Sequence, residues 1–327
     1  MMALVVLLNT AMGVMMRLSS RDGAVPFNTN VIVFLAEALK FMFSFVAVLR
    51  ARASTATRGE GDRSERSLLP PPSACDPLRR ITLRGSLPYA VPAVLYCVNN
   101  NLLFYIYTYL DPASAQVLGN LKIVWTVLLL RFALGRRLAR AHYVAVASLV
   151  GGCVLTQWNE IAQRRAATAD AGVDSSQPPM HASWAVGIAL VLLMTLFSGC
   201  AGVWNEALLK RDASIHYSNL QLYFYGMLLN GGALVVRNGG GLDPATLLRG
   251  FNGWAWAIVL MMSTLGLSIA AVMKYLDSVV KIMCTACSMV FTYAVSIQLF
   301  GAALSGTFVA GGALVFYALW KYDPPRK

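Results

Sequence analysis

The sequence predicts an all-α membrane protein with ten transmembrane helices arranged as two inverted five-helix repeats. Hydrophobic residues make up 57% and charged residues 13% of the 327-residue chain, whereas a soluble domain carries about 25% charged residues. Ten long apolar runs follow one another along the chain. A helix crosses a hydrocarbon core about 30 Å thick with a run of this kind. A repeated sequence pattern divides the ten runs into two sets of five.

The ten runs define the expected spans in chain order. They cover Met1–Leu18, Thr29–Leu49, Leu87–Leu110, Pro112–Phe132, Ala141–Trp158, Trp184–Leu208, Asn219–Val236, Trp254–Met273, Ser278–Phe300 and Leu304–Trp320. The first run opens without a basic segment or a small-residue cleavage site, so we expect a helix there and not a signal peptide. Residues 50–85 hold eight arginines and three successive prolines, which predicts a disordered basic loop.

A short pattern recurs at the same place in both halves. Tyr-Leu-Asp occupies Tyr109–Asp111 before the fourth run and Tyr275–Asp277 before the ninth. The fifth and tenth runs each contain a glycine pair, Gly151/Gly152 and Gly311/Gly312. Because five is odd, the second half must be inverted in the membrane, as in many secondary transporters. The predicted parts are a first repeat over 1–158, a lumenal linker over 159–183 and a second repeat over 184–320.

The positive charges predict the orientation of the chain. Sixteen Lys and Arg fall in the segments after spans two, four and six and in the C-terminal tail, whereas six fall on the opposite side. Cytosolic segments of membrane proteins carry the excess of positive charge, so both termini are expected to be cytosolic. The net charge of +12 therefore reflects membrane topology, and we expect no nucleic acid as a partner.

Two lysines lie inside apolar runs. Lys122 falls about 15 Å into its run, near the middle of the bilayer, at 1.5 Å per residue. A lysine at that depth costs roughly 2.5–3.5 kcal/mol to insert, so it is expected to face an aqueous cavity and bind an anion. Lys281 comes from the other half, and its position near a helix end leaves snorkelling to the interface as the alternative. As compact cations, both suit a phosphate group.

Other polar residues in the runs predict the rest of a site. Of the adjacent amides Asn99, Asn100 and Asn101, one or two should face the cavity, because exposure of all three to lipid is costly. Asn219 and Tyr223 share a helix face at i,i+4. An amide can read the edge of a base and a tyrosine ring can stack on it. The alternative for this pair is anchoring at the membrane interface.

The remaining charged residues in the runs favour ion pairs. Glu37 and Lys40 are spaced i,i+3 and are expected to neutralise each other, with proton coupling by Glu37 as the weaker alternative. The spacing of Lys274, Asp277 and Lys281 allows one carboxylate to pair with both lysines, as a gate or a structural ion pair. Asn205 and Glu206 are expected at the interface. The glycine pairs predict close helix packing, including a possible homodimer seam.

Several classes of function find no support in the sequence. Five of the six cysteines lie in apolar runs, and the single CxxC at Cys284 and Cys287 has no second pair, so we expect no metal site. The chain contains no HExxH, GxSxG or P-loop motif. We therefore expect neither an enzyme nor a cofactor. A non-transporting scaffold or a membrane-embedded transferase remains an alternative to a transporter.

Four runs together resemble a known family. They are VNNNLLFYIYTYLDPASAQVLGNLKIVWTVLL, GGCVLTQW, AGVWNEALLK and GLSIAAVMKYLDSVVKIM. These runs are similar to those of the Golgi nucleotide-sugar transporters, in the drug/metabolite transporter superfamily, and most similar to CMP-sialic acid transporters and their plant relatives. The resemblance implies ten helices, a Golgi membrane location, and exchange of a cytosolic CMP-sugar for lumenal CMP by alternating access. A UDP-sugar or sugar-phosphate exchanger of the same superfamily is the alternative.

The resemblance also assigns roles to individual residues. It implies that Lys122 and Lys281 bind phosphate, that Asn219 and Tyr223 hold the base, and that three further residues lie at the cavity: Asn100, Ser198 and Gln116. Ala115, Ile269 and Ala270 depart from the pattern of animal members, which carry a bulky aromatic residue at the first position and small hydroxyl residues at the other two. These departures leave the identity of the sugar open.

Overall fold

The computed structural model describes residues 1–19, 27–61, 83–110, 115, 118–133, 135, 139–170, 180–212, 214–240, 243–300 and 305–322. All regular secondary structure within these residues is helical. The helices are α1 (Met2–Ser19), α2 (Thr29–Gly61), α3 (Leu83–Tyr109), α5 (Lys122–Phe132), α6 (Arg140–Asp170), α7 (Met180–Arg211), α8 (Ile215–Arg237), α9 (Pro244–Leu247), α10 (Gly253–Tyr275), α11 (Ser278–Phe300) and α12 (Gly306–Lys321).

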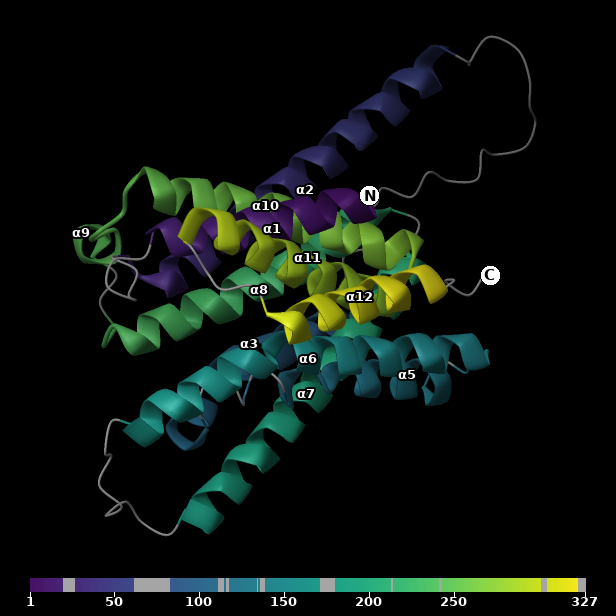
Figure 1. The fold of residues 1–327 in the computed structure, drawn as a ribbon. Helices are drawn as coiled ribbons and strands as arrows, with labels where there is room; N and C mark the ends of the chain where they lie inside the picture. Colours follow the sequence, from purple (N-terminus) through teal and green to yellow (C-terminus); the bar gives the residue numbers. More distant parts are fainter. Residues whose placement is uncertain are drawn as a thin grey trace.

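Each of the ten apolar runs corresponds to helical structure, and α11 has the bounds predicted for the ninth run. Several helices are longer than predicted, and α2 and α6 extend furthest beyond their apolar runs. α2 continues to Gly61 and projects from the bundle (Figure 1), so the first part of the predicted disordered loop is helical. Its sequence there is rich in alanine and arginine, which are strong helix formers. α6 likewise continues to Asp170, into the predicted linker.

The fourth predicted span is not one continuous helix. Residues 118 and 119 are helical, residues 120 and 121 form a turn, and α5 begins at Lys122. Leu121 precedes α5 and provides no side-chain cap. In the first turn of α5, the N–H groups of Ile123 and Val124 donate to the carbonyl oxygens of Asn120 and Leu121, each at 3.0 Å. A short turn held by i,i+3 hydrogen bonds therefore leads into α5 at Lys122, and hydropathy did not predict this turn.

The helices form a bundle in which partners from the two halves of the chain pack in pairs. α6 packs against α12, α2 against α8, α3 against α7 and α1 against α11. Both termini lie at the same end of the bundle (Figure 1). This end is called the terminal end below, and the other, near α9, the distal end.

The glycine pairs form a seam within the chain. A Cβ on Gly152 of α6 would lie 2.8 Å from the carbonyl oxygen of Gly311 on α12, and a Cβ on Gly311 would lie 2.7 Å from the carbonyl oxygen of Gly152. Gly312 packs on Val290 of α11. Packing inside one chain thus occupies Gly152, Gly311 and Gly312, whereas a Cβ on Gly151 would meet nothing within 4 Å. The homodimer seam through these helices stays a prediction.

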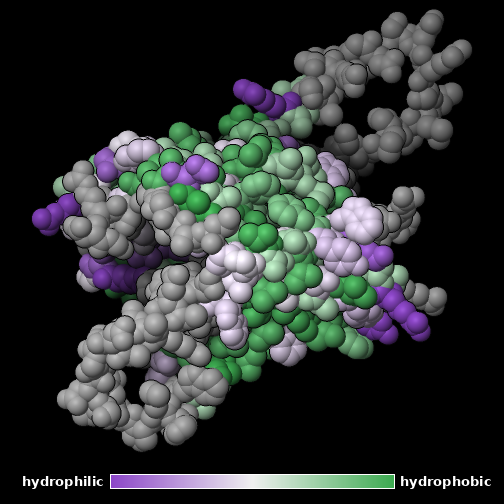
Figure 2. Space-filling view, viewed as in Figure 1, coloured by the Kyte–Doolittle hydropathy of each residue, from purple (hydrophilic) through white to green (hydrophobic). Residues whose placement is uncertain are grey.

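The apolar surface is that of a protein that crosses a membrane several times. Four segments are long and apolar enough to span a bilayer: Thr29–Ala51, Ala185–Arg211, Gly253–Tyr275 and Ser278–Leu299. Met2–Met16 and Arg140–Thr156 are shorter apolar helices. Hydrophobic residues cover the middle of the visible face, with hydrophilic residues toward the two ends (Figure 2).

Candidate functional site

Three cavities that share lining residues run through the interior of the bundle. The first has a volume of about 460 Å³ and extends from Lys281 to Thr29 and Arg237 at the distal end. The second, of about 450 Å³, is lined by α3, α5, α7 and α11 and includes Lys122. A small cavity of about 60 Å³ includes both lysines. Lys281 thus borders the first and small cavities, and Lys122 the second and small cavities.

The two lysines lie in the first turns of helices from opposite halves of the chain. Lys122 is the first residue of α5 and Lys281 the fourth of α11. Thr126 and Thr285 each donate a hydrogen bond to a lysine carbonyl, at 2.8 and 3.1 Å. Among the described residues, no carboxylate pairs with either ammonium group. Both lysines border the small cavity, and their binding of a phosphate group stays a prediction.

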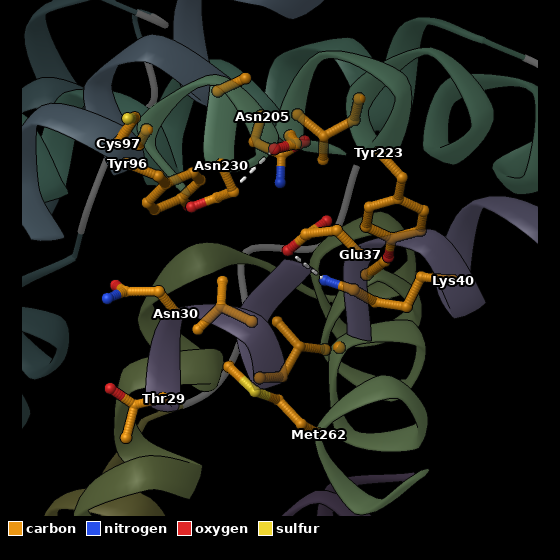
Figure 3. Close-up of a pocket in the computed structure, with 18 of the residues that line it drawn as sticks. Thr29, Asn30, Glu37, Lys40, Tyr96, Cys97, Asn205, Tyr223, Asn230 and Met262 are labelled. Carbon is orange, nitrogen blue, oxygen red and sulfur yellow. Dashed lines mark hydrogen bonds and ion pairs between the residues drawn. The ribbon is translucent and has the colours of Figure 1, made fainter. Parts of the chain in front are cut away.

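The first cavity contains a buried ion pair next to an aromatic ring. Glu37 accepts a 2.6 Å hydrogen bond from Lys40, as the i,i+3 spacing predicted. The Lys40 Nζ atom lies 4.5 Å from the centre of the Tyr223 ring, and Figure 3 shows these three side chains facing one another. Gly226 gives the pair room, because a Cβ there would lie 2.9 Å from a Glu37 carboxylate oxygen. The Glu37 carboxylate, the Lys40 ammonium group and the Tyr223 ring thus lie together on one wall of the first cavity.

The other residue predicted to hold the base lies deeper in the protein. Asn219 is 1% exposed and its Oδ1 atom has no hydrogen-bond partner. It precedes Tyr223 by one turn of α8, but it does not line the first cavity. The structure therefore places Tyr223 in the lining of the first cavity and leaves Asn219 outside it.

The second cavity is lined by neutral polar groups and apolar side chains. Asn99, Asn120, Thr195, Ser198 and Thr285 line it, with Met194, Met289 and Ile282 among the apolar residues. Ser198 also borders the small cavity, as its predicted role requires. Gln116 lies outside the described residues, and so does the side chain of Asn100.

A polar network closes the terminal end of the bundle around Asp212, which directly follows α7. Ser218 of α8 donates a 2.6 Å hydrogen bond to Asp212 Oδ2, and the Tyr89 hydroxyl of α3 bonds to the same oxygen. Lys274 of α10 donates to the Asp212 carbonyl oxygen at 2.9 Å. Three helices are thereby tied to the end of α7.

The predicted ion pair of Asp277 with Lys274 and Lys281 is absent from the described contacts. Asp277 instead caps α11 by accepting from the Val280 N–H at 2.8 Å, and it accepts from the Tyr322 hydroxyl at 2.9 Å. A carboxylate before a helix satisfies free N–H groups of the first turn, so Asp277 is a helix cap. Lys274 belongs to the network around Asp212.

Glu206 forms a buried ion pair that the sequence analysis did not predict, and its position at the membrane interface stays a prediction. Its side chain is fully buried, and its two oxygens accept from Lys210 Nζ and from the Ser278 N–H, each at 2.7 Å. Lys210 also donates to the Leu276 carbonyl oxygen. The i,i+4 spacing of Glu206 and Lys210 was the signal in the sequence that could have predicted this pair.

Sequence reasoning did not single out several lining residues. Tyr96 borders the first cavity, and its ring centre lies 5.7 Å from Lys281 Nζ. Asn120, Thr195 and Thr285 border the second. Tyr96 stands three residues before the asparagines, one turn along the same helix face, which was an available signal. The others are ordinary helix or turn residues whose role depends on tertiary packing.

Comparison with known proteins identifies relatives along the whole chain. The family model for the nucleotide-sugar transporters matches residues 1–323. The chain is 30% identical to CMP-sialic acid transporter 1 of Oryza sativa subsp. japonica, over 99% of this chain and 93% of that protein. It is 32% identical to the probable UDP-sugar transporter protein SLC35A4 of Homo sapiens, over 99% and 94%. A solved crystal structure shares the fold, with a TM-score of 0.61, 15% identity and coverage of 98% and 95%.

Proposed function

The chain belongs to the nucleotide-sugar transporter family, and we propose that it exchanges a cytosolic nucleotide sugar for the lumenal nucleoside monophosphate by alternating access. The observation that carries this proposal is the small cavity with Lys122 and Lys281. Within the part of the chain that the structure describes, neither ammonium group has a carboxylate partner. Two such groups inside a membrane protein stabilise an anion and are costly without one. A phosphate group supplies that anion.

The cavities on either side of the lysines suggest how a nucleotide is oriented. With its phosphate at Lys122 and Lys281, the nucleoside extends into the first cavity toward Tyr223. The Glu37 carboxylate accepts hydrogen bonds and the Lys40 ammonium donates them. Both pyrimidine edges present a donor and a carbonyl acceptor, the donor being an amino group in cytosine and a ring N–H in uracil. This complementarity suits a pyrimidine nucleotide, and the rice relative favours CMP-sugars, including CMP-sialic acid. The human relative favours UDP-sugars as the second candidate.

The pairing of helices supports two inverted five-helix repeats. In two such repeats, α1, α2, α3, α5 and α6 of the first half correspond in order to α7, α8, α10, α11 and α12 of the second. Exchanging corresponding helices turns the pair α3·α7 into α10·α1, α1·α11 into α7·α5, and α3·α8 into α10·α2. All six of these pairs are in contact. α6·α12 and α2·α8 map onto themselves. Across the α6–α12 seam, Gly152 meets residues 311 and 315 while Gly311 meets residues 152 and 156. Such reciprocal contacts are the signature of a two-fold axis.

The two ends of the bundle differ in a way that supports alternating access. The first cavity reaches Thr29 and Arg237 at the distal end, while the network around Asp212 ties helices together at the terminal end. With both termini cytosolic, as the positive charges predict, this conformation faces the lumen. We propose the Golgi membrane as the location, as the family resemblance implies.

Counterflow in liposomes tests the proposal. Purified protein is reconstituted into liposomes loaded with CMP or UMP, and uptake of the labelled nucleotide is measured. Lys122→Gln and Lys281→Gln should each lower nucleotide affinity about ten- to hundredfold, because each removes a charge-assisted contact of roughly 1.5–3 kcal/mol. Lys321→Gln, at the end of α12, is the matched control. Wild-type affinity in both cavity variants would refute the phosphate site.

Exchange is tested separately from binding. Liposomes loaded with labelled CMP should retain it in nucleotide-free buffer and release it when CMP is added outside. The physical reason is that an empty site leaves two lysine charges without an anion inside the membrane and, among the described residues, without a carboxylate partner, so that reorientation of the empty site is slow. Release at the same rate into nucleotide-free buffer would show uniport and refute exchange.

A further inference from the structure

The second cavity contains two amide atoms that lack partners. Asn99 Oδ1 and Asn120 Nδ2 are buried and make no hydrogen bond, and both residues line the cavity. A buried polar atom without a partner costs about 1–3 kcal/mol. One of these atoms is an acceptor and the other a donor. The pair is therefore complementary to a ligand that both donates and accepts.

The charge around this cavity restricts the ligand further. Of the described residues that line it, Lys122 alone is charged, and that lysine also borders the small cavity. The neighbouring segment 99–121 contains no Lys or Arg in the sequence. An anionic group placed deep in this cavity would therefore have no cation of its own. A hydroxyl group donates and accepts without charge, whereas a carboxylate only accepts and would face the Asn99 oxygen.

We propose that the second cavity is the subsite for the sugar of the transported nucleotide sugar, that Asn99 and Asn120 bind its hydroxyl groups, and that it takes an uncharged polyol. This inference rests on the proposed function, because the phosphate at the two lysines places the sugar on the side opposite the nucleoside. A volume of about 450 Å³ is within the usual range for ligand pockets, roughly 300–1,000 Å³.

The proposed subsite is compatible with both candidate substrate classes, UDP-sugars and CMP-sialic acid, because the charges of each lie close to the phosphate. A neutral hexose linked to UDP places its hydroxyl groups in the cavity and both negative charges on the diphosphate. In CMP-sialic acid, the carboxylate is attached to the carbon that carries the phosphate, so it stays beside the lysines. The remainder of that sugar is uncharged. Only an acid group distant from the phosphate, as in UDP-glucuronate, enters the neutral part of the cavity.

Paired ligands test the subsite in the full-length protein. Displacement of labelled nucleotide is measured for CMP and CMP-N-acetylneuraminate and for UMP and UDP-glucose. Asn99→Leu and Asn120→Leu should each weaken the sugar conjugates about three- to tenfold, the effect of one lost hydrogen bond, and leave both monophosphates within twofold. Asn230→Leu is the matched control, because Asn230 borders the first cavity, and should show no loss specific to the conjugates.

The outcomes separate this inference from the proposed function. If the wild-type protein binds none of these nucleotides, the proposed function fails and the subsite with it. If it binds them, but the Asn99 and Asn120 variants weaken a conjugate and its monophosphate in parallel or not at all, only the subsite is overturned.

A second comparison tests the uncharged character of the ligand. UDP-glucose and UDP-glucuronate differ only in a hydroxymethyl group and a carboxylate at the far end of the sugar. We expect UDP-glucuronate to bind at least about tenfold more weakly, equivalent to 1.4 kcal/mol. Equal potency, including equal failure to displace the label, would overturn the assignment to uncharged sugars.

Discussion

The ion pair between Glu37 and Lys40 should act as a unit in stability. Its charged atoms lie 2.6 Å apart, and the two side chains are 18% and 10% exposed. Two unit charges at that distance attract by about 6 kcal/mol at an effective dielectric constant of 20. Desolvation costs several kcal/mol per ion, so the net contribution of the intact pair is small. Removal of one partner is different, because it leaves a charge buried alone.

A double-mutant cycle measures this difference. Glu37→Gln or Lys40→Met alone should lower the free energy of unfolding by about 3 kcal/mol, the low end for breaking a buried pair, because the cavity leaves one side hydrated. The double variant should lose less than the sum by about 2 kcal/mol. Equilibrium unfolding in mixed detergent and SDS micelles provides the measurement, and surface Lys321→Met is the control.

Additive losses in that cycle would refute the reasoning, since they would mean that each side chain is solvated independently in the folded protein. A double variant as damaged as the worse single variant would instead show complete coupling and support it. CMP affinity is measured in the wild-type protein, the two single variants and the double variant. This measurement separates the effect on stability from the effect on nucleotide binding, because only the single variants leave an unpaired charge beside Tyr223.

Three further predictions address the site and the packing. Tyr223→Ala should weaken CMP and UMP by a similar factor, roughly 1–3 kcal/mol if stacking is lost. Asn219→Ala should leave the preference between CMP and UMP unchanged, because Asn219 does not line the first cavity; a narrowed preference would make Asn219 the residue that reads the base. Collapse of a proton gradient should leave CMP exchange unchanged in liposomes, because Glu37 is paired; inhibition would make it a coupling residue. Gly311→Leu should lower the unfolding midpoint, unlike Gly151→Leu, because a Cβ at Gly151 meets nothing within 4 Å.

Hydropathy predicted the positions of the helices because a helix within an apolar run is determined by residues that are close in the sequence. The start at Thr29 and the whole of Ser278–Phe300 agree with the structure. The extension of α2 past Leu49 was missed because the criterion was apolar length, and polar residues of high helix propensity continue a helix into water. The break before Lys122 was missed for the opposite reason. Its turn residues are Asn120 and Leu121, and a single asparagine within an apolar run does not lower the hydropathy enough to mark a break.

The candidate site was predictable only where a residue violated the apolar pattern. Lys122, Lys281, Glu37 and Lys40 stand out because a charge in hydrocarbon is costly. Asn120 does not, since a single amide beside a turn has many ordinary explanations. Its importance depends on the unpartnered Nδ2 atom and on Asn99 from another helix, and sequence alone specifies neither.

The geometry also indicates which contacts must change for the site to open at the terminal end. The α6–α12 seam packs glycine backbone against glycine backbone, a contact that tolerates rotation poorly because a small displacement creates clashes or voids. The network around Asp212 consists instead of single hydrogen bonds from α3, α8 and α10, each with a net contribution of about 1 kcal/mol, or more where a charged group takes part. Such bonds can exchange with water one at a time. Under the proposed function, the seam is therefore suited to remain fixed while the helices around Asp212 separate, and a phosphate group at Lys122 and Lys281 would lower the cost of that step by neutralising both lysines.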